Sequence, residues 1–277
     1  MLSFYSPAKI NLFLQILARR ADGYHQLATL MQTIGLADRL HIELATHDEL
    51  TCTDADIPTD ETNLVRKASA LFRQVSGLNV HCKVHLEKQI PHQAGLGGGS
   101  SNAATTLWAL NQLTGKPFTT QQLLETSAQI GSDIPFFFSQ GTAYCSGRGE
   151  IVEAVPYASV DAVTIVKPME GLATATIYQS LNLDNVCKQS SQEVLKSFSS
   201  QNPLYFNDLE PPAFSRMPML STLKKTLTER GFRTVLMSGS GSAFFCLGEG
   251  NLEYLPANLY SCVTSFMRRP SDSWYTP

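Results

Sequence analysis

The chain has 277 residues, of which 43% are hydrophobic and 16% charged, so it can form one large domain or two ordinary ones with a substantial core. Its net charge is −3 and its basic residues are scattered, which gives no sign of a nucleic-acid-binding surface. No apolar run is long enough to span a bilayer, and residues 1–14 alternate like a strand rather than forming a targeting peptide. We therefore expect a cytoplasmic protein that binds neither membranes nor nucleic acid.

Six cysteines are widely spaced along the chain, and no two form a Cys-x-x-Cys pair, which argues against a zinc site. Because the sequence shows no secretion signal, we expect the thiols to be reduced and mostly buried. They are Cys52, Cys82, Cys145, Cys187, Cys246 and Cys262.

Residues 1–87 predict several strands, one tight turn and one helix. Apolar side chains alternate from Ile10 to Ile16, as on one face of a strand, and the pair Asp22-Gly23 is typical of a tight turn. His81 and His85 lie on the polar face of a predicted strand, where about 3.3 Å per residue places them too far apart to share a metal ion. The predicted elements are strands over 4–17, 29–36, 38–44 and 79–87, a loop over 47–62, and a helix over 63–75 that ends at Gly77.

Residues 91–104 are the most informative stretch, because four of the five residues from Gly95 to Gly99 are glycine. Glycine allows a ligand to approach the backbone closely, and Ser100, Ser101 or Asn102 could cap a helix predicted over 101–113. Free amides at the positive end of a helix suit an anion, most often phosphate. A flexible turn ended by a helix cap is the alternative, but a plain turn rarely combines so many glycines with two hydroxyls.

The common phosphate-binding patterns do not fit this stretch. A P-loop requires a lysine, and none lies between Lys88 and Lys116. The dinucleotide fingerprint of a Rossmann fold would place its third glycine at Ser100 and would open the first βαβ unit of the chain. The motifs of protein kinases are also missing from the sequence.

Residues 120–153 predict a helix over 120–130, an apolar run over 134–138 and a hairpin over 141–153. Asp133 directly precedes the apolar run, where burying a carboxylate without a partner is costly. The residue is therefore either functional or a turn residue before Pro135.

The pattern restarts around residues 156–161, which predicts a domain boundary between 1–156 and 157–277. A Gly/Ser bend over 238–242 joins two short apolar segments, and a simple hairpin would explain it. The elements predicted for this half are strands over 162–167, 234–237 and 243–247 and helices over 174–181, 192–198 and 219–230, with a break at 207–212.

Three segments together resemble the motifs of the GHMP small-molecule kinases, in order and rough spacing, over nearly the whole chain. They are residues 7–12, 91–101 and 238–243. Within that superfamily the sequence is similar to the branch that phosphorylates 4-diphosphocytidyl-2-C-methyl-D-erythritol. The segments that favour this branch are Lys9 with Asn11, 21–25, 97–104, 131–137 and 207–210.

This resemblance implies an α+β fold of two domains, ribosomal-protein-S5-like in 1–156 and ferredoxin-like in 157–277, with ATP and substrate in the cleft between them. It implies transfer of the γ-phosphoryl group of ATP, with Mg²⁺, to the 2-hydroxyl of the methylerythritol unit, a step in non-mevalonate isoprenoid precursor biosynthesis. The partner it implies is this small molecule, diphosphocytidyl-methylerythritol.

The resemblance also implies roles for individual residues. Lys9 and Asp133 match the catalytic pair, and Asn63 with Leu64 match the adenine pocket. The ATP phosphate loop corresponds to Pro91, His92, Gln93, Ala94, Gly95, Leu96, Gly97, Gly98, Gly99, Ser100 and Ser101. The substrate site corresponds to Asn11 beside the methylerythritol hydroxyls, Tyr24 and Tyr178 on the two faces of the cytosine, and His25 at its edge.

Phosphoryl transfer requires mainly in-line positioning and stabilisation of charge, which loop amides, Lys9 and Mg²⁺ would supply. Asp133 either accepts the proton of the attacking hydroxyl or orients that hydroxyl, since a lysine beside it would keep it ionised and make it a weaker base. The hydroxyls of Ser100, Ser101 and Thr105 are candidate Mg²⁺ contacts, and no ligand is assigned among them.

Gln93 departs from the family pattern, in which glycine is common at this position. If the backbone there needs a positive φ, the side chain strains the loop by about 1 kcal/mol or more. Alternatively, the side chain reshapes the nucleotide pocket.

Two other functions on the same fold are alternatives. A kinase for mevalonate, homoserine or a sugar is disfavoured by Tyr24, His25 and Tyr178, because none of these substrates has a planar base to cover. A non-catalytic ligand sensor should have lost Lys9 or Asp133, and both are present.

Overall fold

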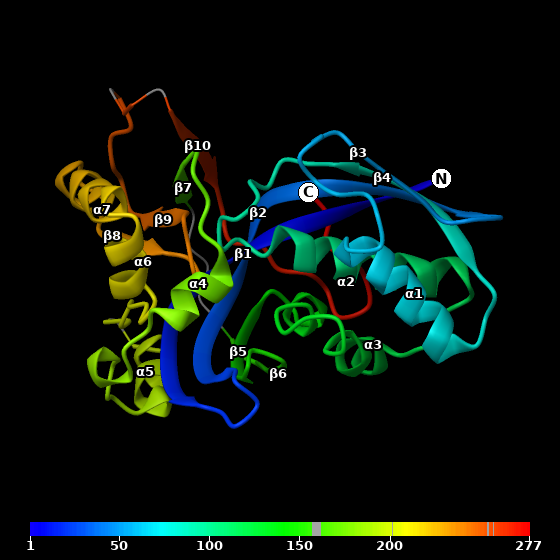
Figure 1. Ribbon diagram of the computed structural model, residues 1–277, viewed down its shortest axis with the longest axis horizontal. Coiled ribbons are helices and arrows are strands. Elements are labelled where there is room, and N and C mark those ends of the chain that lie inside the picture. Colours follow the sequence, from blue (N-terminus) through cyan, green and yellow to red (C-terminus); the bar gives the residue numbers. More distant parts are fainter. Residues whose placement is uncertain (157–161, 201, 254, 257) are drawn as a thin grey trace.

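The computed structural model describes residues 1–277 except 157–161, 201, 254 and 257, and it contains two sheets with helices packed against them (Figure 1). The first half of the chain contributes a six-stranded sheet, and the second half contributes a four-stranded sheet. The predicted domain boundary at 156/157 coincides with residues outside the described part of the chain, so it stays a prediction.

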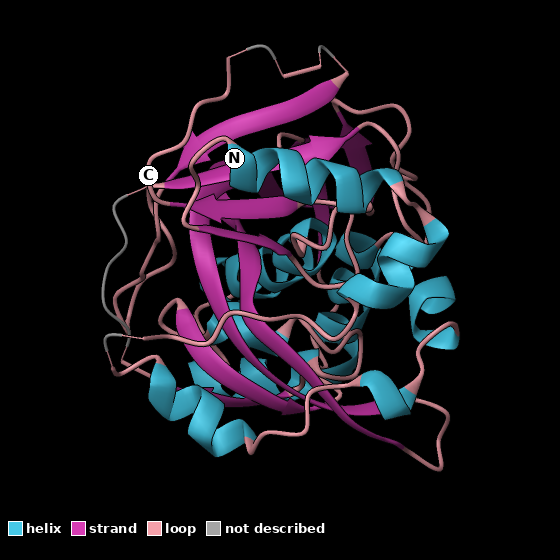
Figure 2. Ribbon diagram, turned by 90° about the vertical axis from the view of Figure 1, so that its left-hand side faces the viewer, coloured by secondary structure: helices cyan, strands magenta, loops and turns pink. Residues whose placement is uncertain are grey.

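The longest element is a ribbon of two antiparallel strands, β1 (Leu2–Arg19) and β2 (His25–Ala45), joined by the predicted turn at Gly23. Two separate strands were expected over 29–36 and 38–44, and this is wrong. The pairing shifts between Pro7 and Ala8, so Gly35 and Leu36 form a bulge and β2 bends without ending. Figures 1 and 2 show the long curved strands of the ribbon running through the middle of the molecule.

The six-stranded sheet has the order β3-β4-β2-β5-β6, with β1 on β2. Its further strands are β3 (Glu49–Cys52), β4 (His81–Glu87), β5 (Thr142–Gly147) and β6 (Ile151–Ala154). β3 lies inside the region expected to be a loop, while β5 and β6 form the predicted hairpin. β2 pairs with β5 through its first half and with β4 through its second half, so this one strand holds the sheet together.

Helices cover one face of this sheet, and α1, α2 and α3 lie side by side there (Figure 1). They are α1 (Leu64–Ser76), α2 (Gly98–Leu113), α3 (Thr120–Ser127) and the 3-10 helix η1 (Pro135–Phe138). Phe72, Leu107 and Phe136 pack against Leu40 and Ile42 of the sheet in a continuous apolar core. The first sheet and its helices thus enclose one core.

The four-stranded sheet is antiparallel, with the order β10-β7-β9-β8. Its strands are β7 (Val163–Pro168), β8 (Thr234–Met237), β9 (Phe244–Leu247) and β10 (Leu259–Thr264). Numbered along the chain this order is 4-1-3-2, the ferredoxin-like order, although the described residues between β9 and β10 form a loop where that motif has its second helix. β10 was not predicted, because its side chains are only partly buried and give a weak pattern.

The second half also contains short helices, packed around its sheet. They are α4 (Thr174–Gln179), η2 (Leu183–Asn185), α5 (Ser191–Ser197), α6 (Glu210–Arg216) and α7 (Met219–Glu229). The prolines Pro211 and Pro212 were expected to break the chain, and this is wrong. They stand in the first turn of α6, where proline costs no backbone hydrogen bond.

The two halves share their apolar cores. Ile16 and Leu27 at the far end of the ribbon pack in one cluster with Leu227 and Phe232 of the second half. In the other direction, Trp274 near the end of the chain packs in the core of the first half. The cavity described below therefore lies between parts that are bound to each other by packing.

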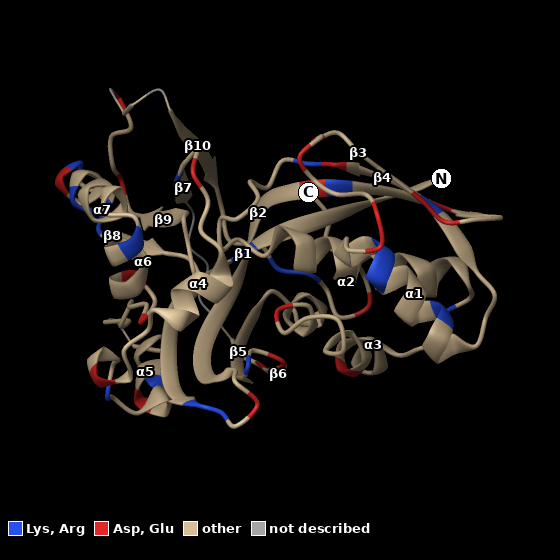
Figure 3. Cartoon of the chain, in the orientation of Figure 1, with Lys and Arg blue, Asp and Glu red and all other residues tan. Residues whose placement is uncertain are grey.

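Charged residues of both signs are interspersed over the two halves (Figure 3). All six cysteines are free thiols, but only Cys82, Cys145 and Cys246 are buried, so the expectation that most would be buried holds for half of them. Within the described residues, no helix has the length and apolar character needed to cross a membrane.

Candidate active site

A cavity of about 1110 Å³ opens between the ribbon, the glycine-rich loop and the second half of the chain. Nearly all the site residues inferred from the sequence line it. They are Lys9, Asn11, Tyr24, His25, Asn63, Leu64, Pro91, His92, Gln93, Ala94, Gly95, Leu96, Gly97, Gly98, Gly99, Ser100, Asp133 and Tyr178. Ser101 does not line the cavity, since it is fully buried and its hydroxyl contacts that of Ser6 at 2.9 Å.

The three sequence motifs meet through hydrogen bonds. The Lys9 amide donates to the carbonyl of Leu96 at 2.9 Å, and the Ser238 hydroxyl donates to the carbonyl of Gly95 at 2.9 Å. The Asn11 amide in turn donates to the Ser238 hydroxyl at 3.3 Å. Segments more than 200 residues apart in the chain thus form one compact unit.

Two glycines of the loop are required by this close approach. Gly95 has φ +73°, and a Cβ atom there would lie 1.9 Å from the carbonyl oxygen of Ser238. Gly97 has φ +70°, and a Cβ atom there would lie 2.8 Å from Cγ of Lys9. Only glycine combines this conformation with this lack of space.

Helix α2 begins at Gly98 with Gly97 as its N-cap, and no side chain caps it. The expectation that Ser100, Ser101 or Asn102 would be the cap is wrong, because all three lie inside the helix, after its N-cap. The uncapped first-turn N–H groups are available to an anion, and the helix dipole favours one there. Because no side chain occupies these N–H groups, this helix start is a better phosphate site than the side-chain-capped start that the sequence indicated.

A buried carboxylate that the sequence reasoning missed anchors the entry to the loop. Asp38 is fully buried on β2 and accepts hydrogen bonds from the Ile90 amide at 2.9 Å and from Nδ2 of Asn102 at 2.9 Å. Nζ of Lys88 lies 2.5 Å from it. Asp38 thus connects the strand before the loop to the helix after it, and a single aspartate in a strand carries no sequence signal for that role.

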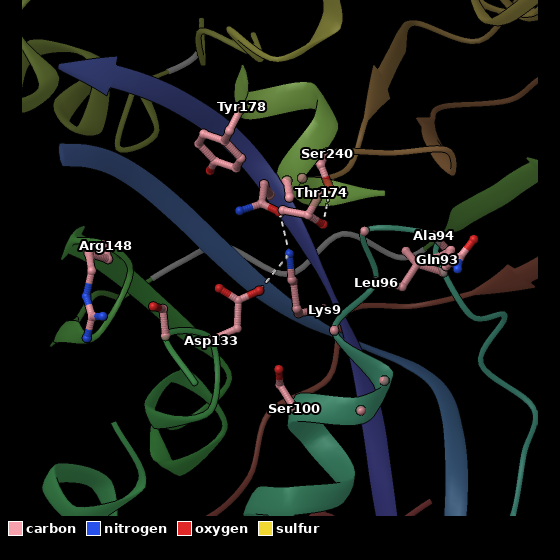
Figure 4. A pocket seen from close by; sticks show the side chains of 18 of the residues that line it. Lys9, Gln93, Ala94, Leu96, Ser100, Asp133, Arg148, Thr174, Tyr178 and Ser240 are labelled. Atoms are coloured by element: carbon pink, nitrogen blue, oxygen red, sulfur yellow. Dashed lines mark hydrogen bonds and ion pairs between the residues drawn. The ribbon is translucent and has the colours of Figure 1, made fainter. Parts of the chain in front are cut away.

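Lys9 and Asp133 face each other in the middle of the cavity (Figure 4). Nζ of Lys9 lies 3.4 Å from Oδ2 of Asp133 and donates to Oδ1 of Asn11 at 2.7 Å. The Lys9 side chain is 4% exposed while that of Asp133 is 35% exposed, so the ammonium group is fixed and the carboxylate can be reached by a substrate. Ser100, at the start of α2, points toward this pair in the same view.

Aromatic side chains line the far end of the cavity, around the turn of the ribbon and α4. The rings of His25 and Tyr178 lie 5.2 Å apart at an angle of 34°. Burial, with a smaller contribution from the positive charge of Arg19, lowers the pKa of His25 below its usual 6.5, which keeps the imidazole neutral at neutral pH. Burial also raises the pKa of Tyr178, which stays protonated.

Two features of this end were missed by the sequence reasoning. The guanidinium of Arg148 lies over the ring of exposed Tyr24, 5.0 Å from its centre. The hydroxyl groups of Thr174 and Ser240 lie 2.8 Å apart and join α4 to the third motif (Figure 4). Arg148 stands in the predicted hairpin turn Gly147-Arg148-Gly149, where a lone arginine is not distinguishable from a solvated surface residue.

The opposite end of the cavity is formed by the start of α1. Asn63 is the N-cap of α1, accepting from the Val65 amide at 2.8 Å and donating to the carbonyl of Pro58. The side chain of Leu64 reaches the backbone of Gly99. This apolar end therefore adjoins the glycine-rich loop.

Gln93 has φ +49°, so the strained conformation considered for this position is present. Its side chain points away from the Lys9–Asp133 pair (Figure 4) and packs against Gly171, in the loop after β7. A Cβ atom at Gly171 would lie 2.5 Å from Cβ of Gln93. The residue thus contacts the second half of the chain.

His81 and His85 behave as predicted, as strand residues. His81 lies 3.5 Å from Asp48, and Nδ1 of His85 lies 2.8 Å from the hydroxyl of Thr51. Among the described residues, no group of three or more His, Cys, Asp or Glu side chains is arranged to hold a metal ion.

The segment Asn207–Glu210 does not line the cavity, but it connects the third motif to the ribbon by hydrogen bonds. Asn207 donates to the carbonyls of Met237 and Gly239, both at 2.7 Å, and Glu210 accepts from the Met237 amide. Asp208 accepts from the Ile16 amide at 2.7 Å, and burial raises its pKa. These bonds fix the Gly/Ser bend of the third motif against the ribbon.

Known proteins are similar to this chain in both sequence and fold. The family "GHMP kinases N terminal domain" matches residues 63–141. The chain is 50% identical to the 4-diphosphocytidyl-2-C-methyl-D-erythritol kinase of Protochlamydia amoebophila over 98% of this chain and 92% of that protein. It is 41% identical to the chloroplastic/chromoplastic enzyme of that name from Solanum lycopersicum, over 99% of this chain and 73% of that protein.

A solved structure of such a kinase has the same fold. The crystal structure of a 4-(cytidine 5'-diphospho)-2C-methyl-D-erythritol kinase superposes with a TM-score of 0.82 at 34% identity, covering 96% of this chain and 99% of that one. Its architecture is thus the one described above for both sheets.

Proposed function

The chain belongs to the 4-diphosphocytidyl-2-C-methyl-D-erythritol kinases of the GHMP family, and from this premise we propose how its cavity is divided among ATP, the transferred group and the substrate. The reaction moves the γ-phosphoryl group of ATP to the 2-hydroxyl of the methylerythritol unit, in isoprenoid precursor biosynthesis. The three parts of the cavity match the three parts of this reaction.

ATP binds at the glycine-rich loop, with its phosphates on the first-turn amides of α2 and its adenine at Asn63 and Leu64. The support is the uncapped helix N-terminus beside an apolar pocket at the start of α1. Gly95 and Gly97 let the loop backbone lie against Ser238 and Lys9, which brings the phosphates to the lysine.

The cytidyl group binds at the opposite end. Tyr24 and Tyr178 would cover the two faces of the cytosine, and His25, held neutral by burial, would form hydrogen bonds to its edge. Arg148 lies beside Tyr24, so its charge is placed to bind a phosphate of the substrate. This placement leaves the methylerythritol unit beside Asn11.

The Lys9–Asp133 pair carries this proposal, because it lies between the two binding ends with its carboxylate partly exposed to the cavity. Lys9 stabilises negative charge on the phosphoryl oxygens during transfer. Asp133 orients the attacking hydroxyl and receives its proton. Asn11, bonded to Nζ of Lys9 and to the hydroxyl of Thr29, holds the lysine in place.

The cavity also fits the Mg²⁺ ion that accompanies ATP. Of the three candidate hydroxyls, those of Ser101 and Thr105 are buried and bonded to Ser6, while Ser100 faces the cavity near Asp133. Ser100 and Asp133 would therefore hold the ion together with phosphate oxygens. When bound, it neutralises charge on the phosphates.

The test is ADP release by the purified protein with ATP and Mg²⁺, offering 4-diphosphocytidyl-2-C-methyl-D-erythritol, mevalonate or homoserine in separate reactions. We expect turnover with the cytidyl substrate alone. Asp133→Asn should lower kcat by about 10²–10⁴-fold, the range for loss of a general base. Glu229→Gln, an exposed carboxylate on α7, is the matched control and should leave kcat unchanged.

Each other outcome contradicts a different part of the proposal. Turnover of mevalonate or homoserine in place of the cytidyl substrate would refute the roles of Tyr24, His25 and Tyr178. Full activity of Asp133→Asn would refute the role of the carboxylate. Failure to turn over any of the three compounds would contradict the proposed activity and would favour a ligand sensor or a glycine-rich loop disabled at Gln93.

A further inference from the structure

The last residues of the chain, 265–277, run from the edge of the four-stranded sheet back to the first half of the molecule. The Met267 amide donates to the carbonyl of Thr33 at 2.9 Å, and Nε1 of Trp274 donates to the carbonyl of Tyr5 at 2.9 Å. Trp274 and Tyr275 are buried in the core of the first half. We call this segment the carboxy-terminal strap.

One arginine of the strap is buried in an unusual way. Arg269 is 4% exposed, and its guanidinium donates to five backbone carbonyl oxygens. Three belong to the strap itself, and the other two belong to Phe138 and Ser139, with Nε of Arg269 2.8 Å from the carbonyl of Ser139. The indole rings of Trp108 and Trp274 each lie 5.6 Å from the guanidinium carbon.

Phe138 is the last residue of η1 and Ser139 is its C-cap, so their carbonyls lie at the end of the helix where carbonyl groups lack partners within it. A cation is favoured at that end by the helix dipole. Arg269 therefore satisfies the carbonyl end of η1 by both hydrogen bonds and charge. Tyr275 adds a hydroxyl 3.4 Å from the same Ser139 carbonyl.

The other end of η1 is at the active site. Asp133 directly precedes Ile134, the N-cap of η1. The ring of Phe137, inside η1, lies against Gly97, where a Cβ atom would be 3.2 Å from Phe137 and 2.8 Å from Cγ of Lys9. A short, fully buried helix thus links Arg269 to Asp133 and to the contact between Lys9 and the loop.

We propose that Arg269 is a positioning residue for phosphoryl transfer, which fixes Asp133 relative to Lys9 by holding the carbonyl end of η1. This inference rests on the role proposed above for Asp133. Removing the guanidinium leaves the buried carbonyl of Phe138 without its donor and that of Ser139 with only the more distant Tyr275 hydroxyl, so η1 moves to find new donors. A displacement of about 1 Å is enough to misalign a reacting group.

The position of Arg269 makes the expected kinetic effect specific. The proposed ATP and cytosine contacts lie on α1, the glycine-rich loop, the start of α2, the ribbon turn and α4, and none lies on η1. Loss of Arg269 should therefore lower kcat while the KM values for ATP and the cytidyl substrate stay nearly constant. A general loss of folded protein would also lower the apparent kcat, but it would lower it by the same factor in the wild-type protein and in an Asp133 variant.

The experiment measures kcat and both KM values for Arg269→Gln, Arg269→Lys and the control Arg268→Gln, whose arginine is exposed beside it. We expect kcat to fall about tenfold or more in Arg269→Gln, by less in Arg269→Lys, and not at all in the control. The same Arg269→Gln change is then made in the Asp133→Asn protein, where we expect no further decrease.

A fold check is available, because the two tryptophans of the chain, Trp108 and Trp274, stack on each other 5.1 Å apart beside Arg269. Their near-ultraviolet circular dichroism reports whether the strap is docked. If Arg269→Gln does not fold, Arg269→Lys decides the question by the same readouts.

Two results would overturn the proposal. One is a folded Arg269→Gln protein whose kcat stays within about twofold of the wild type. The other is an equal loss of kcat in the wild-type and Asp133→Asn backgrounds, which would show a purely structural role. Full activity of Asp133→Asn by itself would instead refute the role of that carboxylate.

Discussion

The two ends of the cavity are built in different ways. At the phosphate end, the proposed ligand surface is backbone, the first-turn amides of α2, and the loop before it is held by Lys9 and Ser238, which donate to the carbonyls of Leu96 and Gly95. At the cytosine end, the surface consists of side chains on a turn and a short helix, and Tyr24 is exposed. We infer that the first end is rigid and intolerant of substitution, while the second determines affinity for one substrate.

This difference follows from what each end must bind. A phosphate group needs several donors at fixed directions, which a helix N-terminus and glycine provide without side-chain entropy. A planar base needs flat apolar faces and one or two polar contacts, which aromatic side chains provide. Changes at the two ends should therefore differ in size and in the kinetic constant they affect.

The largest effect is expected at Gly95. Gly95→Ala places a Cβ atom 1.9 Å from the Ser238 carbonyl, so the loop and the third motif must separate. We expect kcat/KM for ATP to fall about 100-fold or more, or the protein not to fold. Gly77→Ala is the matched control, because Gly77 has φ +68° but no atom lies within 4 Å of a Cβ placed there. It should lower the free energy of unfolding only by the roughly 1–2 kcal/mol that a left-handed backbone costs an alanine. Similar kinetics for both variants would contradict the close-contact account.

A smaller effect, on another constant, is expected at Tyr178. Tyr178→Leu removes the ring proposed to cover the cytosine, and base stacking on an aromatic side chain contributes about 1–3 kcal/mol. The KM for the cytidyl substrate should rise about tenfold to a hundredfold, while the KM for ATP stays constant. Tyr178→Phe keeps the ring and should behave like the wild type. A change in the KM for ATP instead would contradict the assignment of the two ends of the cavity to two different ligands.

The pH dependence of the KM for the cytidyl substrate tests the proposed role of His25. Burial and then the charge of Arg19 lower the pKa of His25 below 6.5, so the neutral ring is the form present at neutral pH. The KM for the cytidyl substrate should be flat above pH 6.5 and rise as the pH falls through the lowered pKa. Arg19→Gln removes one cause of the shift, so the rise should begin at higher pH. A pH-independent KM in the wild type would exclude His25 from the site.

The smallest effect is expected where Gln93 meets Gly171. Gly171→Ala introduces a Cβ atom 2.5 Å from Cβ of Gln93, so the side chain and the edge of the loop must shift slightly. We expect the ATP KM to change by about two- to threefold and to return toward the wild-type value in the Gln93→Gly, Gly171→Ala double variant. A large effect that persists in the double variant would assign Gly171 another role.

Much of the phosphate end could be predicted from the sequence, because its chemistry is local. Consecutive glycines at the start of a helix indicate a phosphate loop from the sequence alone. The positive φ considered for Gln93 is also present. The cap prediction failed, however, because Ser101 and Asn102 bond instead to Ser6 and Asp38 on the ribbon. Those partners are about 60 to 100 residues away along the chain and are joined only by tertiary packing.

Long-range contacts account for the other omissions. β2 continues through a bulge that its pattern does not reveal, and β10 is an edge strand with half-buried residues. Arg148 and Arg269 resemble ordinary surface charges in the sequence. Only the fold shows that one lies over Tyr24 and that the other is buried at the end of η1.

Hydrogen–deuterium exchange with ADP and with cytidine 5′-diphosphate, each added alone to the wild-type protein, tests the division of the cavity most directly. ADP should protect amides in residues 63–65 and 91–101. Cytidine 5′-diphosphate should protect amides around residues 22–27, 148 and 174–179. Two separate footprints are the predicted result. Protection of the glycine-rich loop by cytidine 5′-diphosphate, with no protection at the ribbon turn, would contradict the account.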